Sequence, residues 1–182
     1  MILLMGIPGS GKGTQGNLLA ATRKYQVIST GELLRTYGST EQHARMQAGE
    51  ILGDEEVTAL LDKALAGLED QDRTILDGYP RRINQAEWLI EQSRAGRFHL
   101  DYVIYLMASP ESVTQRLQAR GRKDDHDGAI QARFIKYEQE TMPILEFLRG
   151  QGVKIVEVNA EQPIEDVHQE LLAIDFSQSR KE

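Results

Sequence analysis

A glycine-rich stretch near the N-terminus constrains this chain more than any other feature. Residues 6–14 read GIPGSGKGT, follow a short apolar run at 2–5 and precede a helical pattern at 15–25. A strand, a turn of the form GxxxxGK and a helix, in that order, are typical of a phosphate-binding loop. Glycines let backbone N–H groups converge on one point, and the start of the helix adds unpaired N–H groups and the positive end of its dipole. The pattern therefore predicts a loop that binds phosphate.

Two side chains of this loop extend the prediction. Lys12 would bring a mobile positive charge to the outer phosphates, and Thr14 offers a hydroxyl to Mg²⁺ or phosphate. Gly13 follows the lysine where such loops usually have Ser or Thr. The alternative is an ordinary glycine-rich turn with a solvated lysine. The glycines, the lysine and the flanking elements together favour phosphate binding.

Five short apolar runs predict the fold class. They lie at residues 2–5, 27–28, 74–76, 102–107 and 153–158, with helical patterns between them. Short apolar strands that alternate with helices indicate an α/β protein with a parallel sheet covered on both faces. Residues 29–58 look like an insertion, because three helical pieces at 31–37, 40–51 and 54–67 occur where one crossover helix would suffice. A long helix is predicted at about 130–148, with a kink at Pro143.

Composition narrows the classes of function. The 182 residues suffice for one domain, and the absence of cysteine excludes disulfides and thiolate metal sites. No apolar run approaches membrane-spanning length, so we expect a soluble, cytoplasmic protein without a membrane partner. A formal net charge of −7 argues against non-specific binding to nucleic acid. Phosphates must therefore be bound by local clusters of Lys and Arg.

Asp77 begins the first of two further candidate sites. It directly follows the run at 74–76 and opens the sequence DGYPRR at 77–82. Ligands of open parallel sheets bind beyond the carboxyl ends of the strands, so Asp77 is well placed to hold Mg²⁺ beside the phosphate loop. The alternative is an ordinary β-turn, because Asp-Gly and Pro are turn formers. Arg81 and Arg82 follow this turn and favour an anion site, but Asp77 could instead pair with one of them.

Cations cluster at a second place. Arg116 and Arg120 share one helix face, and Arg122, Lys123 and Arg133 follow. Like charges at this spacing cost stability unless an anion lies between them, and arginine grips phosphate in a bidentate manner. A solvated charged face is the alternative. In an acidic chain with a phosphate loop, phosphate binding is favoured.

Five stretches in order resemble the adenylate kinases, within the nucleoside monophosphate kinases. They are residues 6–15 (GIPGSGKGTQ), 28–35 (ISTGELLR), 76–85 (LDGYPRRINQ), 120–125 (RGRKDD) and 133–143 (RFIKYEQETMP). The resemblance implies reversible phosphoryl transfer from Mg-ATP to AMP, giving two ADP, within nucleotide biosynthesis. The transfer would be an in-line attack with no covalent intermediate. ATP, AMP and ADP would be the partners of a monomer, and Mg²⁺ the cofactor.

The resemblance also implies an architecture. It is a P-loop α/β/α fold of three layers, with a five-stranded parallel sheet in a single kinase domain at 1–182. The core would comprise 1–28, 59–118 and 127–182, with a helical NMP-binding insertion at 29–58. The lid at 119–126 would be of the minimal kind, without the zinc-binding lobe of longer relatives.

Roles carry over from the family position by position. The implied ATP site comprises Gly9, Ser10, Gly11, Lys12, Gly13, Thr14, Arg116, Arg120 and the backbone carbonyl of Ala160. The implied AMP site comprises Thr30, Arg35, Glu50, Ile51, Leu52, Gly78, Arg81, Gln85, Arg122 and Arg133. Catalytic roles are implied for Lys12, Arg81, Arg116, Arg122 and Arg133. Asp77, through water, and Thr14 would hold Mg²⁺.

Acceptor choice and departures from the family concern the same region. Similar pyrimidine monophosphate kinases carry Asn near Gln85 and Ala at the position of Thr30, so these two residues favour AMP. The amide of Gln85 can pair its donor and its acceptor with an adenine edge. The segment at 36–47 is several residues shorter than usual, and Gly53 stands where the family has proline, which would loosen that hinge.

Other functions stay open at this point. One is a pyrimidine or broad-specificity nucleoside monophosphate kinase. Another is a nucleotide-binding sensor or scaffold without phosphotransfer, although the charged residues that the chemistry requires are present. An ATPase or GTPase switch is a further alternative, but the chain has no Asn-Lys-x-Asp stretch for guanine.

Overall fold

A central parallel sheet organises the computed structural model, which describes residues 1–48, 53–123 and 125–176. Its strands are β1 (Ile2–Met5), β2 (Gln26–Ser29), β3 (Thr74–Asp77), β4 (Tyr102–Met107) and β5 (Lys154–Asn159). Their order is β2-β3-β1-β4-β5, and every neighbouring pair is parallel. The predicted five-stranded parallel sheet is confirmed. β3 and β2 lie on one side of β1, whereas β4 and β5 lie on the other, so the order in which strands are added switches sides at β1. Such a switch point is where ligands of this fold class bind.

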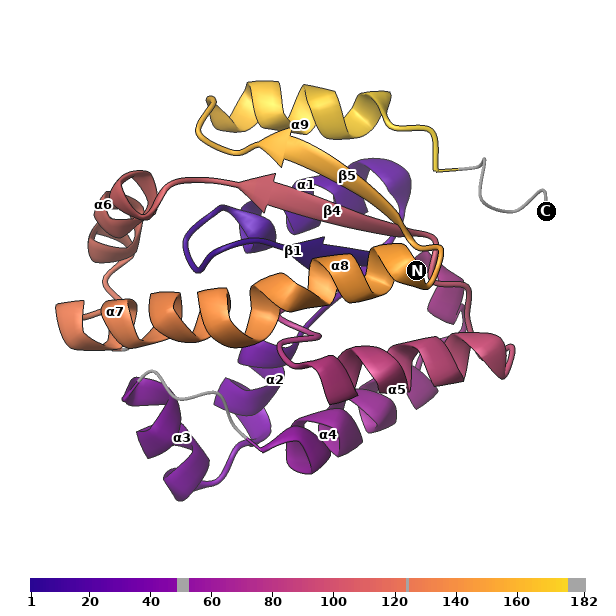
Figure 1. Cartoon of the computed structure of the whole chain (residues 1–182), viewed down its shortest axis with the longest axis horizontal. Coiled ribbons are helices and arrows are strands. Elements are labelled where there is room, and N and C mark those ends of the chain that lie inside the picture. The colour runs from indigo at the N-terminus through magenta and orange to yellow at the C-terminus, as the bar shows by residue number, and fades with distance from the viewer. Residues whose placement is uncertain (49–52, 124, 177–182) are drawn as a thin grey trace.

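Helices cover both faces of the sheet, which gives three layers (Figure 1). One face carries α1 (Lys12–Arg23) and α9 (Ile164–Ala173). The other carries α2 (Thr30–Tyr37), α4 (Asp54–Ala66), α5 (Ile83–Arg94) and α8 (Met142–Gly150). A short 3₁₀ turn at Gln71–Arg73 leads into β3.

The alternation of side chains along β1 explains why both faces need covering. Leu3 and Met5 pack into the core beneath α2, α4, α5 and α8, whereas Ile2 and Leu4 pack beneath α1 and α9. Successive residues of a strand point to opposite faces, so an apolar run without polar alternation must be buried on both. All four residues are at most 2% exposed. The loop at 6–11 therefore begins at a fixed point, at the carboxyl end of this buried strand.

Three helices lie around this end of the sheet. α3 (Thr40–Gln47) belongs to the predicted insertion, and α6 (Pro110–Arg120) and α7 (Asp127–Lys136) flank the lid segment. Residues 49–52, which include part of the helix predicted at 40–51, lie outside the described residues. A third apolar cluster, with Ile7, Leu117 and Phe134 among its members, packs the loop, α6 and α7 together.

The long helix predicted at 130–148 is not a single α-helix. α7 passes into a π-helical turn at Tyr137–Thr141, and α8 then begins at Met142 with Pro143 in its first turn. Proline has no N–H to donate to the preceding turn, and a wider turn upstream accommodates it. The sequence predicted a kink at Pro143, and the structure has a π-helical turn directly before the α-helical segment that contains this proline.

Across the described ranges, we find no helix with the length and apolarity needed to cross a membrane.

Candidate active site

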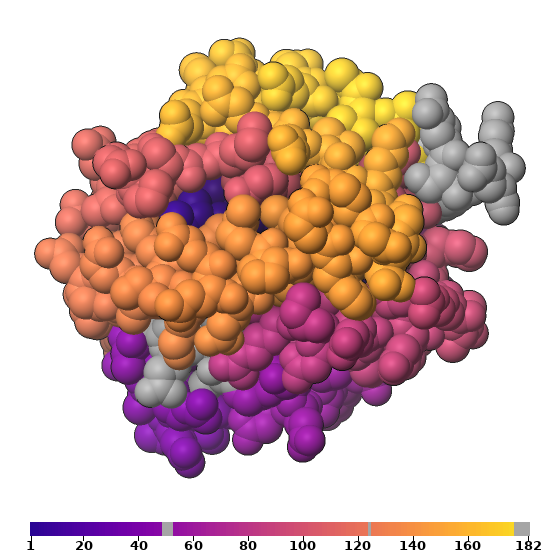
Figure 2. Space-filling model, viewed as in Figure 1, coloured from indigo at the N-terminus to yellow at the C-terminus, as the bar shows by residue number. Residues whose placement is uncertain are grey.

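A cavity of about 1000 Å³ opens beyond the carboxyl end of β1. Figure 2 shows indigo atoms of the N-terminal segment at the bottom of a hollow. The part of the chain around β4 and α6 lies on one side of this hollow, and α7 lies on the other. Among the described residues, seven cationic side chains and three carboxylates line it. The cations are Lys12, Arg35, Arg81, Arg116, Arg120, Arg122 and Arg133. In a chain of net charge −7, this concentrates positive charge at one place.

The glycine-rich loop forms one wall of the cavity. Gly9 and Gly11 have φ of +90° and +97°, where residues with a side chain are strained. A Cβ on Gly9 would also come within 2.9 Å of Leu117. α1 starts at Lys12, and its first backbone N–H to bond within the helix is that of Gln15, which donates to Gly11 at 2.9 Å. The preceding N–H groups at the start of α1 are left for an anion.

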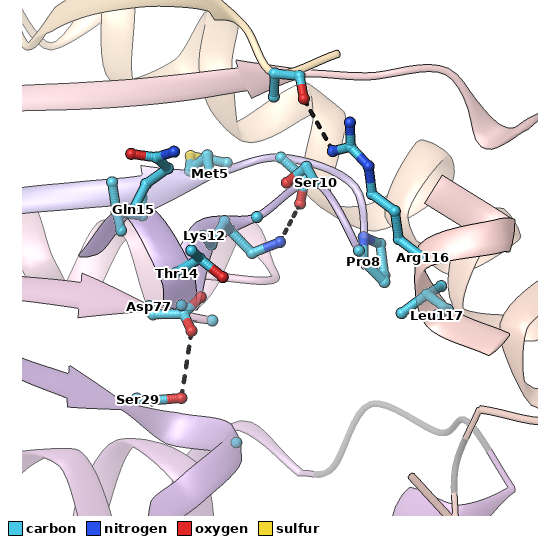
Figure 3. A pocket seen from close by; sticks show the side chains of 18 of the residues that line it. Met5, Pro8, Ser10, Lys12, Thr14, Gln15, Ser29, Asp77, Arg116 and Leu117 are labelled. Carbon is cyan, nitrogen blue, oxygen red and sulfur yellow. Dashed lines mark hydrogen bonds between the residues drawn. The ribbon is translucent and has the colours of Figure 1, made fainter. Parts of the chain in front are cut away.

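Lys12 folds back over the loop. Its Nζ donates to the carbonyls of Gly6 at 2.7 Å and Ile7 at 3.0 Å. Burial lowers the pKa of Lys12 to about 8, and the nearby positive charges of Arg81, Arg120 and Arg133 act in the same direction against the attraction of Asp77. Figure 3 shows Lys12 and Asp77 beside α1, with Arg116 across the cavity. A phosphate would relieve this crowding of positive charge.

Asp77 and Thr14 supply hard oxygen donors next to the loop. Ser29 Oγ donates to Asp77 Oδ2 at 3.4 Å, which orients the carboxylate. A Cβ on Gly13 would lie 3.8 Å from the same oxygen, so the glycine leaves the space between Asp77 and α1 open. A carboxylate, a hydroxyl and room for water fit a magnesium ion, which keeps several waters and takes other ligands from phosphates. Among the described residues, no group of three or more His, Cys, Asp or Glu side chains could hold a metal by itself.

The turn after β3 presents one arginine to the cavity and withdraws the other. Arg81 Nε donates to the carbonyl of Gly78 at 2.9 Å and lines the cavity. Arg82 Nε instead pairs with Glu140 at 2.5 Å, and its Nη1 reaches Asp54 at 3.5 Å. Two arginines were expected at an anion site, but only Arg81 is turned toward it.

Thr30 and Gln85 lie behind the cavity surface rather than on it. Thr30 Oγ1 donates to the carbonyl of Gly78 at 2.8 Å. The amide of Gln85 accepts from the backbone N–H of Arg81 at 2.7 Å and donates to Asp54 at 2.8 Å. Both residues are at most 3% exposed, and neither lines the cavity.

The lid segment is organised by Asp125. Arg120 donates to its carboxylate through Nε at 2.8 Å and Nη2 at 2.7 Å, Arg133 Nη2 donates at 3.0 Å and the backbone N–H of Arg122 at 3.1 Å. Burial alone would raise the pKa of Asp125, but the hydrogen bonds from the two arginines outweigh it and lower the pKa to about 2. Two side chains of the predicted cluster of cations, Arg120 and Arg133, are therefore held by one buried carboxylate.

Arg116 occupies the far side of the cavity. Its Nη1 donates to the backbone carbonyl of Ala160 at 2.9 Å, so the carbonyl implied for the ATP site bonds to this guanidinium. Glu161 Oε1 accepts from the N–H and hydroxyl of Ser109 at 2.8 and 2.6 Å, and these bonds lower the pKa of Glu161. They tie the start of α6 to the segment after β5.

Most residues predicted at the site line this cavity. They are Gly9, Ser10, Gly11, Lys12, Gly13, Thr14, Arg35, Asp77, Gly78, Arg81, Arg116, Arg120, Arg122, Arg133 and Ala160. The residues at 50–52 (Glu50, Ile51 and Leu52) lie outside the described residues.

Sequence reasoning missed several residues that line the cavity, among them Tyr137, Thr141 and Ile164. Thr141 Oγ1 donates to the carbonyl of Arg81 at 3.1 Å and so connects the π-helical turn to the loop after β3. Burial raises the pKa of Tyr137. Tyr137 and Thr141 lie within the stretch at 133–143, but a helical pattern alone could not reveal that a π turn directs them inward.

Comparison with known proteins agrees with the geometry. The family model described as adenylate kinase matches residues 4–153 of this chain. Adenylate kinase 1 of Synechocystis sp. is 34% identical over 172 residues, which cover 91% of each chain. The adenylate kinase of Synechococcus sp. (strain JA-2-3B'a(2-13)) is 38% identical over 184 residues, covering 95% of this chain and 94% of the relative. That of Oenococcus oeni is 35% identical over 169 residues, with 88% and 90% covered.

Proposed function

This chain belongs to the adenylate kinase family, and we propose that it catalyses reversible transfer of a phosphoryl group from ATP to AMP, giving two molecules of ADP. One observation carries the proposal. A phosphate loop and six arginines line a single cavity. Arg35 and Gly78 reach it from α2 and the end of β3, on one side of β1, and Arg116 and Ala160 reach it from the segments after β4 and β5, on the other side. Such a cavity suits two nucleotides whose phosphates meet in the middle.

ATP, the phosphoryl donor, is bound by the phosphate loop and by arginines of α6. Backbone N–H groups of 9–14 and the start of α1 bind the ATP phosphates in this proposal, and Arg120 adds a guanidinium. Arg116 covers the adenine. Because its Nη1 donates to Ala160 in this structure, adenine binding at that carbonyl requires Arg116 to release or share it.

AMP, the phosphoryl acceptor, is bound by the segments that follow β2 and β3. Arg35 and Arg81 bind the AMP phosphate, and Gly78 lets the backbone pass close to it. Thr30 supports this loop from behind through its bond to the Gly78 carbonyl. The amide of Gln85 pairs with the edge of the AMP adenine in this proposal, and residues 50–52 contribute to the same site.

Transfer itself needs positive charge along the path of the phosphoryl group. Lys12, Arg122 and Arg133 stabilise the negative charge on the oxygens of this group as it moves from donor to acceptor. Arg81 holds the attacking phosphate of AMP in line. No side chain acts as a covalent nucleophile, because the AMP phosphate attacks directly. Preorganised cations act mainly on charge that develops in the transition state, so their loss should lower kcat more than it raises KM.

Magnesium is the proposed cofactor. Asp77, through water, and Thr14 would hold it next to the phosphates, and when bound it neutralises their charge and orients them for transfer. Ser29 keeps the carboxylate of Asp77 turned toward the loop.

Closure and assembly complete the proposal. We propose that the insertion at 29–58 and the short lid at 119–126 close over the nucleotides as units distinct from the core. Closure would exclude water, which otherwise competes with AMP for the phosphoryl group. The protein would act as a monomer, because each of the two sites is built from a single chain.

The test is ADP formation by the purified protein with Mg-ATP and AMP, CMP, UMP, GMP or no acceptor. Rapid ADP formation with AMP and almost none without acceptor is expected. Equal turnover with CMP or UMP would assign the chain to a broader acceptor class. ADP formation at one rate with and without AMP would overturn the proposal in favour of an ATPase.

A further inference from the structure

Asp54 lies at the start of α4, and its carboxylate accepts hydrogen bonds from three side chains at 82–85, around the start of α5. Its Oδ1 accepts from Gln85 Nε2 at 2.8 Å and from Arg82 Nη1 at 3.5 Å, and its Oδ2 accepts from Asn84 Nδ2 at 2.6 Å. The Asp54 side chain is 23% exposed, whereas Gln85 as a whole is 2% exposed. A carboxylate of the insertion thus holds the residue proposed to read the adenine.

The chemistry of the two partners dictates which way the Gln85 amide faces. The backbone N–H of Arg81 can only donate, so the amide atom 2.7 Å from it must be the oxygen Oε1. A carboxylate can only accept, so the atom facing Asp54 must be the nitrogen Nε2. Rotating the amide by 180° would put two donors against each other at Arg81 and two acceptors against each other at Asp54. Gln85 is buried, so water cannot readily compensate for either mismatch.

A fixed amide presents a fixed pattern to a base. Each amide atom keeps one unused position, the second hydrogen of Nε2 and the second lone pair of Oε1. Adenine matches a donor and an acceptor held in this order, because its 6-amino group donates and its N1 accepts. A 6-oxopurine has the reverse order on the same edge, since its O6 accepts and its N1–H donates. Only a rotated amide would match it.

We propose that Asp54 is a specificity-determining positioning residue, which favours AMP over 6-oxopurine nucleotides by fixing the orientation of the Gln85 amide. The inference rests on the proposed function, since it assumes that Gln85 meets the acceptor base. Arg81 supplies the second constraint from its backbone, which no side-chain substitution removes. Asp54 is therefore the constraint that mutation can release.

The test uses Asp54→Asn in the full-length protein. Asparagine can donate as well as accept, so the cost of rotating Gln85 falls while the shape at the start of α4 is kept. The ratio of kcat/KM for AMP to kcat/KM for IMP should fall about tenfold, the scale of one hydrogen bond to a charged group. Part of this change should be a rise in kcat/KM for IMP, which general damage to the fold would not produce.

Two further variants separate positioning from simple loss of structure. Asp54→Glu keeps the acceptor-only chemistry and should preserve most of the AMP preference. Asp62→Asn removes another carboxylate of α4, one that pairs with Arg97, and should change both kcat/KM values by less than about twofold. Thermal unfolding followed by circular dichroism establishes that each variant is folded at the assay temperature.

The outcomes are distinct. An unchanged AMP-to-IMP ratio in a folded Asp54→Asn protein, or an equal loss with both acceptors, would overturn the inference and leave the proposed function intact. If Asp54→Asn does not fold, loss of the preference in folded Asp54→Glu overturns the inference and its retention supports it. A wild-type protein that does not phosphorylate AMP would overturn the proposed function itself.

Discussion

The carboxylate of Asp125 and the guanidinium of Arg120 form two parallel hydrogen bonds, 2.8 Å from Nε to Oδ2 and 2.7 Å from Nη2 to Oδ1. Arg133 donates to the same carboxylate at 3.0 Å. The Asp125 side chain is fully buried, while that of Arg120 is 35% exposed. One carboxylate therefore fixes two of the cations that face the cavity.

Asp125→Asn should cost stability and activity together. An amide can accept from only one of its two polar atoms, so the bidentate pairing is lost and the positive charges are left uncompensated. The free energy of unfolding at pH 7 should fall by about 2 kcal/mol, and KM for ATP should rise. Urea denaturation and steady-state kinetics measure these effects. The matched control is Asp127→Asn, whose carboxylate bonds only to Gln118 among the described contacts and should be near neutral.

The same carboxylate should make stability depend on pH. The pKa of Asp125 is lowered from 3.8 to about 2 in the folded protein, so its stabilising effect is fully present above the unfolded value and is lost as pH falls through the folded one. The difference in unfolding free energy between wild type and Asp125→Asn should therefore shrink between about pH 4 and pH 2. A constant difference across that range would show that the Asp125 ion pairs are not its source.

Lys12→Met should remove most of the activity without unfolding the protein. Lys12 is buried among cations and acts on charge that develops during transfer, so kcat should fall by about 10³-fold or more with a smaller change in KM for ATP. The temperature of thermal unfolding at pH 7 should be at least as high as that of wild type, because burial disfavours the charged amine. Retained turnover would rule out the proposed role of Lys12.

Nucleotide binding should take up protons near pH 8. The pKa of Lys12 is about 8 without phosphates, so about half of the molecules carry a neutral amine at that pH. Phosphates beside Nζ favour the charged form and raise this pKa, so ATP binding should bring about 0.5 proton per molecule. Isothermal titration in two buffers of different ionisation enthalpy measures the uptake. Lys12→Met reports what the nucleotide itself contributes, and equal uptake in both proteins would contradict the assignment.

Gly78→Ala should disturb the turn after β3. Gly78 has φ of +81°, and a Cβ there would lie 2.9 Å from Thr30 Oγ1. The left-handed conformation and the close approach should together lower the unfolding free energy by about 2 kcal/mol and raise KM for AMP. Gly67→Ala is the control, because Gly67 has φ of −83° and its nearest neighbour to a new Cβ is 3.6 Å away.

Arg122→Ala and Lys123→Ala test whether the cations of the lid lower the barrier to transfer from a defined place in the cavity or only add to the surface charge. Arg122 lines the cavity, whereas its exposed neighbour Lys123 is not among the residues that line it. Arg122→Ala should lower kcat by about 10²-fold, since a cation near the transferred group is worth a few kcal/mol. Lys123→Ala should change kcat by less than about twofold. Similar effects of the two substitutions would identify the cluster as a solvated charged face.

Local patterns sufficed for the elements that build the site. Each strand of the sheet overlaps an apolar run of the sequence. The loop at 6–14 is recognisable in the sequence because its backbone needs φ near +90° at residues 9 and 11, which favours glycine at both positions. The cations of the lid were recognised because they stand close together in the chain. These features depend on near neighbours in sequence.

Contacts across long sequence separations were not predictable in the same way. The amide of Gln85 was expected to offer both atoms to a base, but each already bonds within the protein, one of them to Asp54 across 31 positions. Arg82 was expected beside an anion and instead pairs with Glu140, 58 positions away. A side chain with several possible partners takes the one that the fold brings near, and composition does not reveal which.

The sequence by itself determined the order of strands and helices, the phosphate loop and the family. Those properties follow from residue conformation and from apolar periodicity, which act over a few neighbouring residues. Only the tertiary structure decided which side chains reach the cavity, which way the Gln85 amide faces and that Arg82 pairs with Glu140. Those outcomes depend on hydrogen bonds between distant segments, whose partners are chosen by packing and by the cost of leaving a buried polar group unpaired.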